Sequence, residues 1–409
     1  MDAADVEDAA RRLEGVVRRS PVHRSDRLSE RIAGEVWLKR EDLQAVRSYK
    51  LRGAYNLIAQ LSDEARIKGV VCASAGNHAQ GLAFACAALG VRGTVFLPRT
   101  TPRQKRDRIA ALGGQHVRVE LVGDTYDEAA AAASKHAAAI GATVVPAFDD
   151  ERTVAGQGTV IAEAIDQLGS VPDVVVVPVG GGGLMAGTVT WLRERHPNVR
   201  VVGVEPEGAT SLAAAIVAGK PVTLEELDTF VDGAAVRRIG SVTFEVLSDA
   251  EVVSVSAGRV CSEMLEYYQV EGIVTEPAGA LSAAALSVLD LPPGQTVLCV
   301  VSGGNNDVSR YAEIVERALV FEGRKHYFLV EFAQEPGALR NFLDDVLGPD
   351  DDITLFEYVK RNNRETGPAL VGIELADAGD LPGLLERMEA APSRIEHLPP
   401  DSPLTRFLV

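Results

Sequence analysis

Residues 174–196 read VVVVPVGGGGLMAGTVTWLRERH, an apolar run, four glycines and a helical stretch in immediate succession. The apolar run has the length and composition of a strand that is buried on both faces. Its four glycines are Gly180, Gly181, Gly182 and Gly183. Glycines permit positive φ and close backbone approach, so consecutive N–H groups at the start of a helix converge on an anion. We therefore expect a phosphate site here, with a plain structural turn as the alternative.

The same alternation of apolar run, turn and helical stretch recurs on both sides of this segment. Further apolar runs that end at turns are residues 69–73, 94–97, 115–122, 143–147, 201–205 and 296–301. Short strands alternating with helices predict an α/β fold whose parallel sheets are covered on both faces. Such folds bind ligands beyond the carboxyl ends of their strands, where these turns lie.

From about residue 325 the pattern changes to that of a small α+β domain. Stretches typical of strand, helix, strand, strand, helix and strand lie at residues 326–332, 336–347, 352–360, 368–375, 380–390 and 394–399. This succession is the ferredoxin-like order. We therefore expect an α/β body that ends near residue 320 and a separate domain over residues 325–409.

Composition and charge limit the possible partners. The chain has 409 residues, a formal net charge of −17 and only 5% aromatic residues. An acidic chain without a dense basic run or a base-stacking surface is a poor candidate for nucleic-acid binding. No stretch approaches the ~20 apolar residues of a membrane helix, and the charged N-terminal segment lacks the apolar centre of a signal peptide. We expect a soluble, cytoplasmic protein with no nucleic-acid or membrane partner.

The four cysteines also favour a reducing compartment. They lie far apart in the sequence, none forms a C-x-x-C pair, and each stands in an apolar run: Cys72, Cys86, Cys261 and Cys299. A chain of this length can build its own core without a disulfide framework, so we expect four buried, reduced thiols.

The glycine run does not by itself identify the phosphate ligand. No Lys-Ser/Thr pair follows the last glycine, which excludes a Walker loop. Gly181, Gly183 and Ala186 match the G-x-G-x-x-A pattern of dinucleotide-binding folds. Glu205 ends a strand about twenty residues later, as a ribose-binding acid does. A nicotinamide-dependent dehydrogenase is therefore one open hypothesis, although it leaves two other motifs unexplained.

These two motifs are SYKLRGA at residues 48–54 and SAGNHAQG at residues 74–81. A lysine in a basic amphipathic helix is usually a solvated surface residue. Here Lys50 precedes the first βα unit of a chain that also carries a phosphate-binding glycine run. An amine beside a phosphate site suits a phosphorylated cofactor that forms an imine with lysine.

Five motifs occur in one order along the chain: SYKLRGA, SAGNHAQG, GGGGL at 180–184, EPAGA at 276–280 and SGGN at 302–305. In this the chain resembles the fold-type II pyridoxal-phosphate enzymes, and most closely the biosynthetic threonine dehydratases, over nearly its whole length. The resemblance implies pyridoxal 5'-phosphate as cofactor and a two-lobed fold with parallel sheets like those of tryptophan synthase β. It also implies a catalytic domain over residues 1–320, whose small lobe, at about residues 45–145, is inserted in the large lobe.

The resemblance also implies roles for particular residues. Lys50 would hold the cofactor as a Schiff base and act as the catalytic base. Asn77 would bind the ring hydroxyl oxygen, and Ser302 would face the pyridine nitrogen. The remaining cofactor-binding residues would be Tyr49, Gly180, Gly181, Gly182, Gly183, Leu184, Gly233 and Glu276. The substrate-binding turn would consist of Ser74, Ala75, Gly76, Asn77 and His78.

The implied reaction is the conversion of L-threonine to 2-oxobutanoate and ammonia, the first step of isoleucine biosynthesis. A serine at the pyridine nitrogen cannot keep that nitrogen protonated, which favours prompt β-elimination over transamination. Ala75 stands where serine racemases of this fold carry a second serine, so we expect little racemisation. A catabolic serine/threonine dehydratase and a non-catalytic amino-acid sensor remain alternatives.

The tail resembles the ACT-like domain of biosynthetic threonine dehydratases, through EPGAL at residues 335–339. The resemblance implies isoleucine as a feedback inhibitor, valine as an opposing activator and a homotetramer. A packing or dimerisation module without a ligand is the alternative.

No metal site is expected. Relatives hold a cation in the segment that contains Glu205 and Ala209, but Ser211 stands in place of a frequent acidic ligand. We expect Glu205 to cap a helix or form an ion pair instead.

Overall fold

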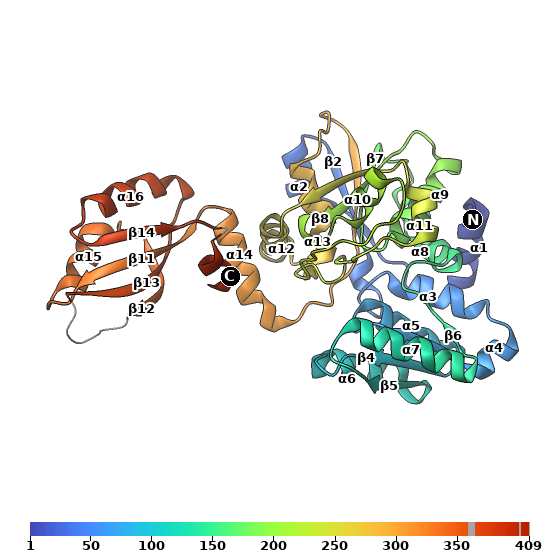
Figure 1. Ribbon diagram of the computed structural model, residues 1–409. Coiled ribbons are helices and arrows are strands. Elements are labelled where there is room, and N and C mark those ends of the chain that lie inside the picture. The colour runs from blue at the N-terminus through green and yellow to red at the C-terminus, as the bar shows by residue number, and fades with distance from the viewer. Residues whose placement is uncertain (359–364, 401, 409) are drawn as a thin grey trace. The chain divides into compact units, whose positions relative to one another are not determined.

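The computed structural model describes residues 1–358, 365–400 and 402–408, and divides into two compact units, Met1–Asn306 and Asp307–Val409 (Figure 1). The sequence predicted a body that ends near residue 320. Helix α14 (Tyr311–Phe321) instead groups with the second unit. There Glu316 on α14 accepts a hydrogen bond of 2.5 Å from Lys325 Nζ on the first strand of that unit.

A six-stranded sheet forms the large lobe of the first unit. Its order is β1 (Val22–Ser25), β2 (Glu35–Arg40), β10 (Thr296–Val301), β7 (Val174–Pro178), β8 (Arg200–Pro206) and β9 (Glu251–Val255). All neighbours pair in parallel except β1 and β2. The parallel arrangement brings the carboxyl ends of β10, β7 and β8 to one edge, as the sequence predicted. Strands β1, β2 and β9 were not predicted, because their polar residues interrupt the apolar runs.

A second, four-stranded parallel sheet forms the small lobe. Its order is β5 (Val117–Leu121), β4 (Gly93–Leu97), β3 (Val70–Ala73) and β6 (Thr143–Val144). The sequence predicted a strand over residues 143–147, but the structure has only the first two residues of it. Pro146 has no N–H to donate to a ladder, so the chain leaves the sheet there and runs on as an irregular segment.

Helices cover both sheets, and most begin or end at residues suited to those positions. Thr125 and Glu128 form a capping box at α7 (Tyr126–Ile140). Gly90, Gly141 and Gly169 end α5 (Asn77–Leu89), α7 and α8 (Glu151–Leu168) in the left-handed conformation. The α-helices of this unit are α1 (Ala3–Leu13), α2 (Asp26–Ile32), α3 (Lys50–Ala59), α4 (Asp63–Lys68), α5 (Asn77–Leu89), α6 (Arg103–Gly113), α7 (Tyr126–Ile140), α8 (Glu151–Leu168), α9 (Gly183–Arg195), α10 (Ser211–Ala218), α11 (Ser241–Leu247), α12 (Ala257–Glu271) and α13 (Pro277–Ala284). The 3₁₀ turns are η1 (Glu41–Leu43), η2 (Gly114–His116), η3 (Glu207–Ala209) and η4 (Ala285–Ser287).

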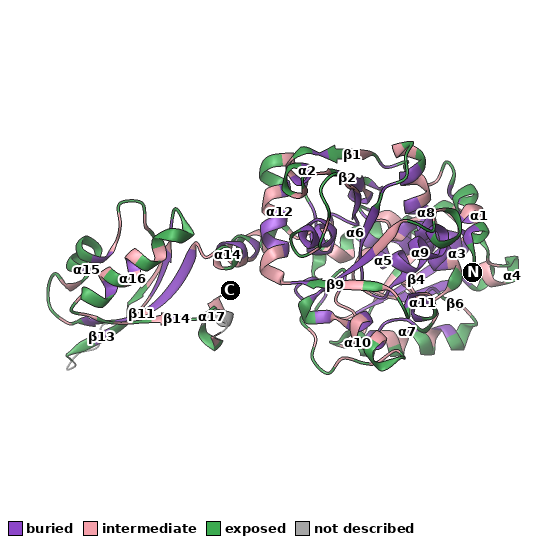
Figure 2. Ribbon diagram, turned by 90° about the horizontal axis from the view of Figure 1, so that it is seen from above, coloured by how far each residue is buried: buried purple, intermediate pink, exposed green. Residues whose placement is uncertain are grey.

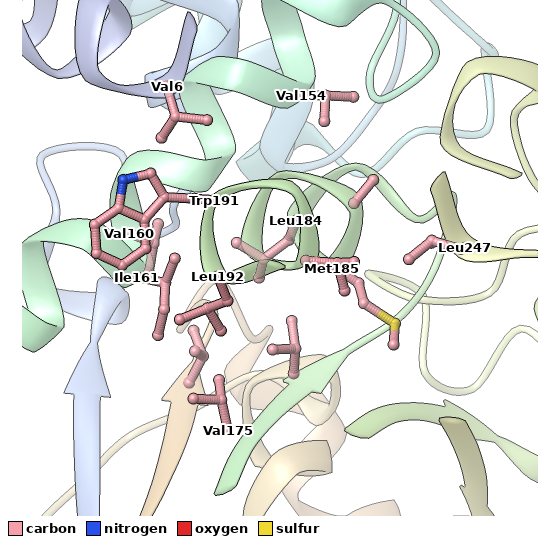
Figure 3. Close-up of a cluster of buried hydrophobic side chains, with 14 of the residues drawn as sticks. Val6, Val154, Val160, Ile161, Val175, Leu184, Met185, Trp191, Leu192 and Leu247 are labelled. Carbon is pink, nitrogen blue, oxygen red and sulfur yellow. The ribbon is translucent and has the colours of Figure 1, made fainter. Parts of the chain in front are cut away.

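The largest apolar core lies where α8 and α9 pack on the central strands. Leu184, Met185 and Leu192 on α9 meet Ile161 on α8 and Val175 on β7 (Figure 3). Figure 2 shows burial concentrated in such central elements, whereas α4 has no buried residue. This core fixes the start of α9, and with it the glycine run, against the large sheet.

The second unit has the β-α-β-β-α-β order that the sequence predicted. Its elements are η5 (Val308–Arg310), α14, β11 (Lys325–Ala333), α15 (Ala338–Val346), β12 (Asp352–Tyr358), β13 (Thr366–Glu374), η6 (Ala378–Asp380), α16 (Leu381–Ala390), β14 (Arg394–Leu398) and α17 (Pro403–Leu408). The strands form one antiparallel sheet in the order β12-β13-β11-β14. The last two residues of the predicted strand 352–360 lie outside the described residues.

Two further findings concern the whole described chain. No helix in it is long and apolar enough to span a bilayer. All four cysteines are buried, and none of them forms a disulfide within the described residues, as expected.

Candidate active site

Lys50 is the first residue of α3, and the backbone on its N-terminal side is bound to the turn after β10. Tyr49 N donates to Ser302 O at 3.1 Å, and Ser48 forms an antiparallel bridge with Gly303. The structure therefore brings together the SYKLRGA and SGGN motifs from distant parts of the sequence. Lys50 Nζ lies 5.1 Å from the centre of the Tyr49 ring.

The Lys50 side chain is directed toward the irregular segment that follows β6. Its Nζ donates to Ala147 O at 3.2 Å. The next residue, Phe148, packs so closely on the glycine run that a Cβ on Gly181 would overlap its ring. Lys50 and the glycine run thus contact two consecutive residues of one segment, which links the amine to the expected phosphate site.

The glycine run lies between the end of β7 and the start of α9. Gly182 has φ +87, and Thr243 Oγ1 donates to Gly181 O at 2.9 Å. Within the described residues, no side chain caps α9, so its first N–H groups remain for another acceptor. Leu184 buries its side chain in the core (Figure 3), so only its backbone can contribute to an anion site.

Asn77, the first residue of α5, is held by two side chains from the large lobe. Asn77 Nδ2 donates to Glu276 Oε1, and Asn77 Oδ1 accepts from Asn305 Nδ2, each at 2.6 Å. Asn305 also donates to Val46 O at 2.8 Å. These contacts leave one Asn77 N–H available for a ligand. The SGGN motif contained Asn305, but sequence reasoning assigned it no role.

Glu276 is buried between Asn77 and the glycines of the large lobe. A Cβ on Gly303 would overlap its carboxylate, and a Cβ on Gly233 would lie 3.4 Å from Glu276 Oε1. Burial, and then the negative charge of Asp232, raise the pKa of Glu276 to about 7. This carboxyl group therefore changes its charge in the neutral pH range.

We expect Glu276→Gln to alter the pH dependence of stability. The pKa of Glu276 rises on folding from its ordinary value of 4.5 to about 7, so the folded state binds its proton more tightly. Stability from this group is complete below pH 4.5 and is lost as the pH rises to about 7. Glutamine keeps the hydrogen-bond acceptor without the charge. The free energy of unfolding of the variant, relative to that of the parent, should therefore be higher at pH 8 than at pH 5, by on the order of 1–3 kcal/mol.

Thermal unfolding of the cofactor-free proteins at both pH values measures this difference. Glu64→Gln, at an exposed position on α4, is the control and should show no such gain. An equal effect of Glu276→Gln at pH 5 and pH 8 would contradict the assignment.

Ser302 lies at the end of β10 and is buried. Its Oγ donates to Ala278 O at 3.1 Å. A neutral hydroxyl of this kind can redirect its single O–H to a ring nitrogen, but it cannot keep that nitrogen protonated as a carboxylate does.

The turn that contains Ser74, Ala75 and Gly76 joins β3 to α5. Ser74 Oγ accepts from Gly76 N at 3.3 Å, and within the described residues no side chain caps α5. The first N–H groups of this thirteen-residue helix are therefore suited to a carboxylate.

His78 holds the same turn through a hydrogen bond to the segment that follows β6. Its Nε2 lies 2.8 Å from Val145 O, so the neutral ring donates to that carbonyl. Burial, and then the charge of Lys50, lower the pKa of His78 to about 4. The imidazole is thus neutral at physiological pH and holds the turn rather than offering a charge.

Glu205 caps α10, as the sequence led us to expect. Its carboxylate accepts from Leu212 N at 2.7 Å and from Ala213 N at 3.0 Å. Burial raises its pKa to about 7 despite these donors. A glutamate bound to a helix terminus is not free to bind ribose, which removes the main support for a dinucleotide site. Among the described residues, no group of three or more His, Cys, Asp or Glu side chains could hold a metal ion.

These residues together fit a phosphorylated aldehyde cofactor. In the part of the chain that the structure describes, no side chain caps the N-terminus of α9 or of α5. The glycine run is too crowded by Phe148 and Thr243 for any side chain of its own. A lysine amine lies close to the same segment. The site therefore offers an amine, a backbone anion cradle and a carboxylate-binding turn.

Family comparisons agree with this geometry. Residues 13–303 match the model of the pyridoxal-phosphate dependent enzymes, and residues 316–408 match that of the C-terminal regulatory domain of threonine dehydratase.

Individual relatives point the same way. The chain is 60% identical to "L-threonine dehydratase biosynthetic IlvA" of Mycobacterium tuberculosis, over all of this chain and 96% of the relative. It is 48% identical to the Bacillus subtilis protein of that name, over 98% of this chain and 96% of the relative. Processed threonine deaminase isoform 2 of Solanum lycopersicum matches with a TM-score of 0.72 and 35% identity, over 78% of this chain and 94% of that one. Maize serine racemase matches with a TM-score of 0.72 and 28% identity, over 78% of this chain and 98% of that one.

Proposed function

The chain belongs to the pyridoxal-phosphate dependent enzymes and, among them, to the biosynthetic threonine dehydratases, and from this premise we propose how its residues act. It converts L-threonine to 2-oxobutanoate and ammonia with pyridoxal 5'-phosphate as cofactor. The observation that carries this conclusion is that Lys50 follows the residue bound to Ser302 O, while the consecutive residues Ala147 and Phe148 contact Lys50 Nζ and the glycine run.

The cofactor, when bound, supplies an aldehyde for the lysine amine and an electron-accepting ring. Lys50 Nζ would hold the aldehyde of the cofactor, and the lysine amine would take the proton from Cα of the substrate. The backbone of Gly180–Gly183 would hold the phosphate. Asn77 would donate its remaining N–H to the ring hydroxyl oxygen, and Ser302 would donate to the ring nitrogen.

The remaining site residues bind and orient the substrate. The turn at Ser74–Gly76 and the start of α5 would hold the threonine carboxylate. His78 keeps that turn in place through Val145 O. Ala75 offers no proton to the face of Cα opposite Lys50, which supports elimination rather than racemisation. Tyr49, Gly233 and Glu276 would line the ring.

The direct test is an assay of the purified protein with L-threonine. Formation of 2-oxobutanoate with one equivalent of ammonia is the expected result, and D-serine should not form from L-serine at a comparable rate. A protein that binds pyridoxal phosphate but forms neither product would overturn the proposed activity and favour an amino-acid sensor.

For regulation, we propose that the second unit binds isoleucine. A cavity of about 720 Å³ lies between the end of β11 and α15, with apolar walls from Phe332, Leu339, Leu343 and Phe356. Glu335 and Arg340 lie at the same cavity, and no side chain among the described residues caps α15. This combination suits a free amino acid with an aliphatic side chain, since both its charges and its apolar part find partners. Valine as an activator and the homotetramer stay predictions.

Arg340→Ala should raise the isoleucine concentration for half-inhibition at least about tenfold, because a charge-assisted bond to the effector carboxylate is lost. The uninhibited kcat should not change. Arg394→Ala, on exposed Arg394 of β14, is the matched control in the same unit. Inhibition that is unaffected by Arg340→Ala would place the effector elsewhere.

A further inference from the structure

A buried ion cluster includes Arg52, which stands two residues after Lys50 on α3. Its members are Lys39 on β2, Glu41 on η1, Arg52 on α3 and Glu163 on α8. Arg52 and Glu41 have side-chain exposures of 1% and 0%, and Lys39 has 0%. Two cations and two carboxylates balance, so the cluster carries no net charge into the interior.

Arg52 is the centre of this cluster and uses its whole guanidinium. Its Nε and Nη2 donate to the two oxygens of Glu41 at 2.9 and 2.8 Å. Its Nη1 donates to Thr159 Oγ1 at 3.2 Å, and both Nη1 and Nη2 donate to Glu163 Oε2 at 3.1 Å. Burial opposes the charged form of Glu41, but the charge of Arg52 outweighs it and lowers the pKa of Glu41.

The first turn of α3 needs an external anchor. Within the described residues, no side chain caps this helix, and Arg52 N donates to the backbone at Tyr49 O at 3.0 Å. Gly53 N donates instead to Gln157 Oε1 on α8 at 3.1 Å. Gly156 on α8 allows close approach, since a Cβ there would lie 2.7 Å from Arg52 O. Lys50 belongs to this same turn.

Glu41 connects the cluster to the strand pair that ends next to Ser302. Glu41 follows directly after β2, which pairs in parallel with β10 in the register Arg40 with Val301. Ser302 is the next residue after that pair. Arg52 therefore ties the first turn of α3 to the strand pair whose end carries the residue expected at the ring nitrogen.

The α8 side of the cluster leads to the glycine run. The backbones of α8 and α9 lie close together at Gly158 and Gly187, where a Cβ on Gly158 would lie 2.8 Å from Gly187 O. Helix α9 begins at Gly183. Through Thr159 and Glu163, Arg52 therefore also sets α3 against the helix that carries the phosphate cradle.

Stability alone does not account for such a cluster, because buried ion pairs often stabilise a fold no better than apolar residues of similar volume. We propose that Arg52 is a positioning residue, which fixes Lys50 relative to both Ser302 and the glycine run through Glu41 and Glu163. This inference rests on the proposed function of Lys50.

The test compares Arg52→Lys with Arg27→Lys. Lysine keeps the charge of Arg52 but lacks the planar fork that reaches Glu41, Thr159 and Glu163 together. Arg27 is a matched control, since it is 15% exposed and forms ion pairs with Glu263, Glu266 and Glu271 on α12 rather than on α3 or α8. Both variants should lose thermal stability.

For Arg52→Lys we expect kcat for L-threonine to fall roughly tenfold, with KM changed far less, because a misplaced catalytic amine slows the reaction. The cofactor-free protein should bind pyridoxal phosphate about fivefold or more weakly, since the Lys50 amine no longer lies in the right position relative to the glycine run. Visible absorption measures this affinity. Arg27→Lys should keep both values within about twofold of the parent.

Full kcat and full cofactor affinity in folded Arg52→Lys would overturn the inference, as would equal losses in Arg27→Lys. If Arg52→Lys does not fold, Glu163→Gln tests the positioning role in its place. For this smaller change we expect at least a threefold loss in kcat. A parent protein that is inactive on L-threonine would instead refute the proposed function, and the cofactor-affinity comparison would still test Arg52.

Discussion

Replacement of Lys50 by alanine should lower kcat/KM for L-threonine by at least about 10³-fold, because the variant loses both the covalent attachment and the base. The backbone around residue 50 is held by Tyr49 N to Ser302 O and by the Ser48–Gly303 bridge, neither of which uses the lysine side chain. The variant should therefore fold. Steady-state kinetics give the loss, and borohydride treatment followed by mass spectrometry shows whether the cofactor is attached at this residue.

Lys68→Ala is the control for Lys50→Ala. Lys68 lies on α4 of the same lobe, has a side chain that is 44% exposed and pairs with Glu64. Its loss should leave kcat/KM within about twofold, because exposed ion pairs contribute little. Substantial turnover by Lys50→Ala, or borohydride fixation at another lysine, would refute the assignment of the catalytic amine.

Gly181→Ala should weaken pyridoxal phosphate binding roughly 10- to 100-fold, since overpacking of a tight site costs ~1–3 kcal/mol. A Cβ at this position would overlap the Phe148 ring, which packs across the glycine run and follows the carbonyl bound by Lys50. Either the ring or the loop must move, so the glycine run and Lys50 would no longer lie in the right positions relative to each other. Titration of the cofactor-free variant by visible absorption measures the loss.

The double variant Gly181→Ala with Phe148→Ala separates crowding from other causes. Removal of the ring opens the space that the new methyl group needs, so part of the cofactor affinity should return. Phe148→Ala by itself is the reference for the loss of the aromatic ring. A double variant no better than Gly181→Ala would show that the glycine is needed for another reason, and unaltered affinity in Gly181→Ala would exclude the run as the cradle.

The periodicity of the sequence predicted most of the fold because most elements are local. The runs at residues 174–179 and 296–301 became central parallel strands, and the tail adopted its predicted order of strands and helices. Strands β1, β2 and β9 were not predicted, because polar residues interrupt their apolar runs. The strand expected over residues 143–147 was too long, because Pro146 ends the ladder.

The site was predictable only as a set of motifs. Lys50, Asn77, Ser302 and the glycine run stood out by their residue types, and their roles came from a family resemblance. Phe148 and Thr243 gave no signal, because a phenylalanine or threonine in a loop is ordinary until its neighbours are known. Asn305 lay within a recognised motif, yet its bond to Asn77 depends on the packing of two lobes.

By itself, the sequence determined the two-part organisation, the parallel α/β body and the chemical groups available for catalysis. These properties follow from hydrophobic periodicity, turn residues and short motifs, which act over a few neighbouring residues. Only the tertiary structure decided which groups meet: Lys50 with Ala147, Glu276 with Asn77, and Arg52 with both Glu41 and Glu163. Glu205 shows the reason most clearly. Its position in the sequence suits a ribose-binding acid, but its partners are two N–H groups of α10, and a pairing of that kind is set by how the chain packs.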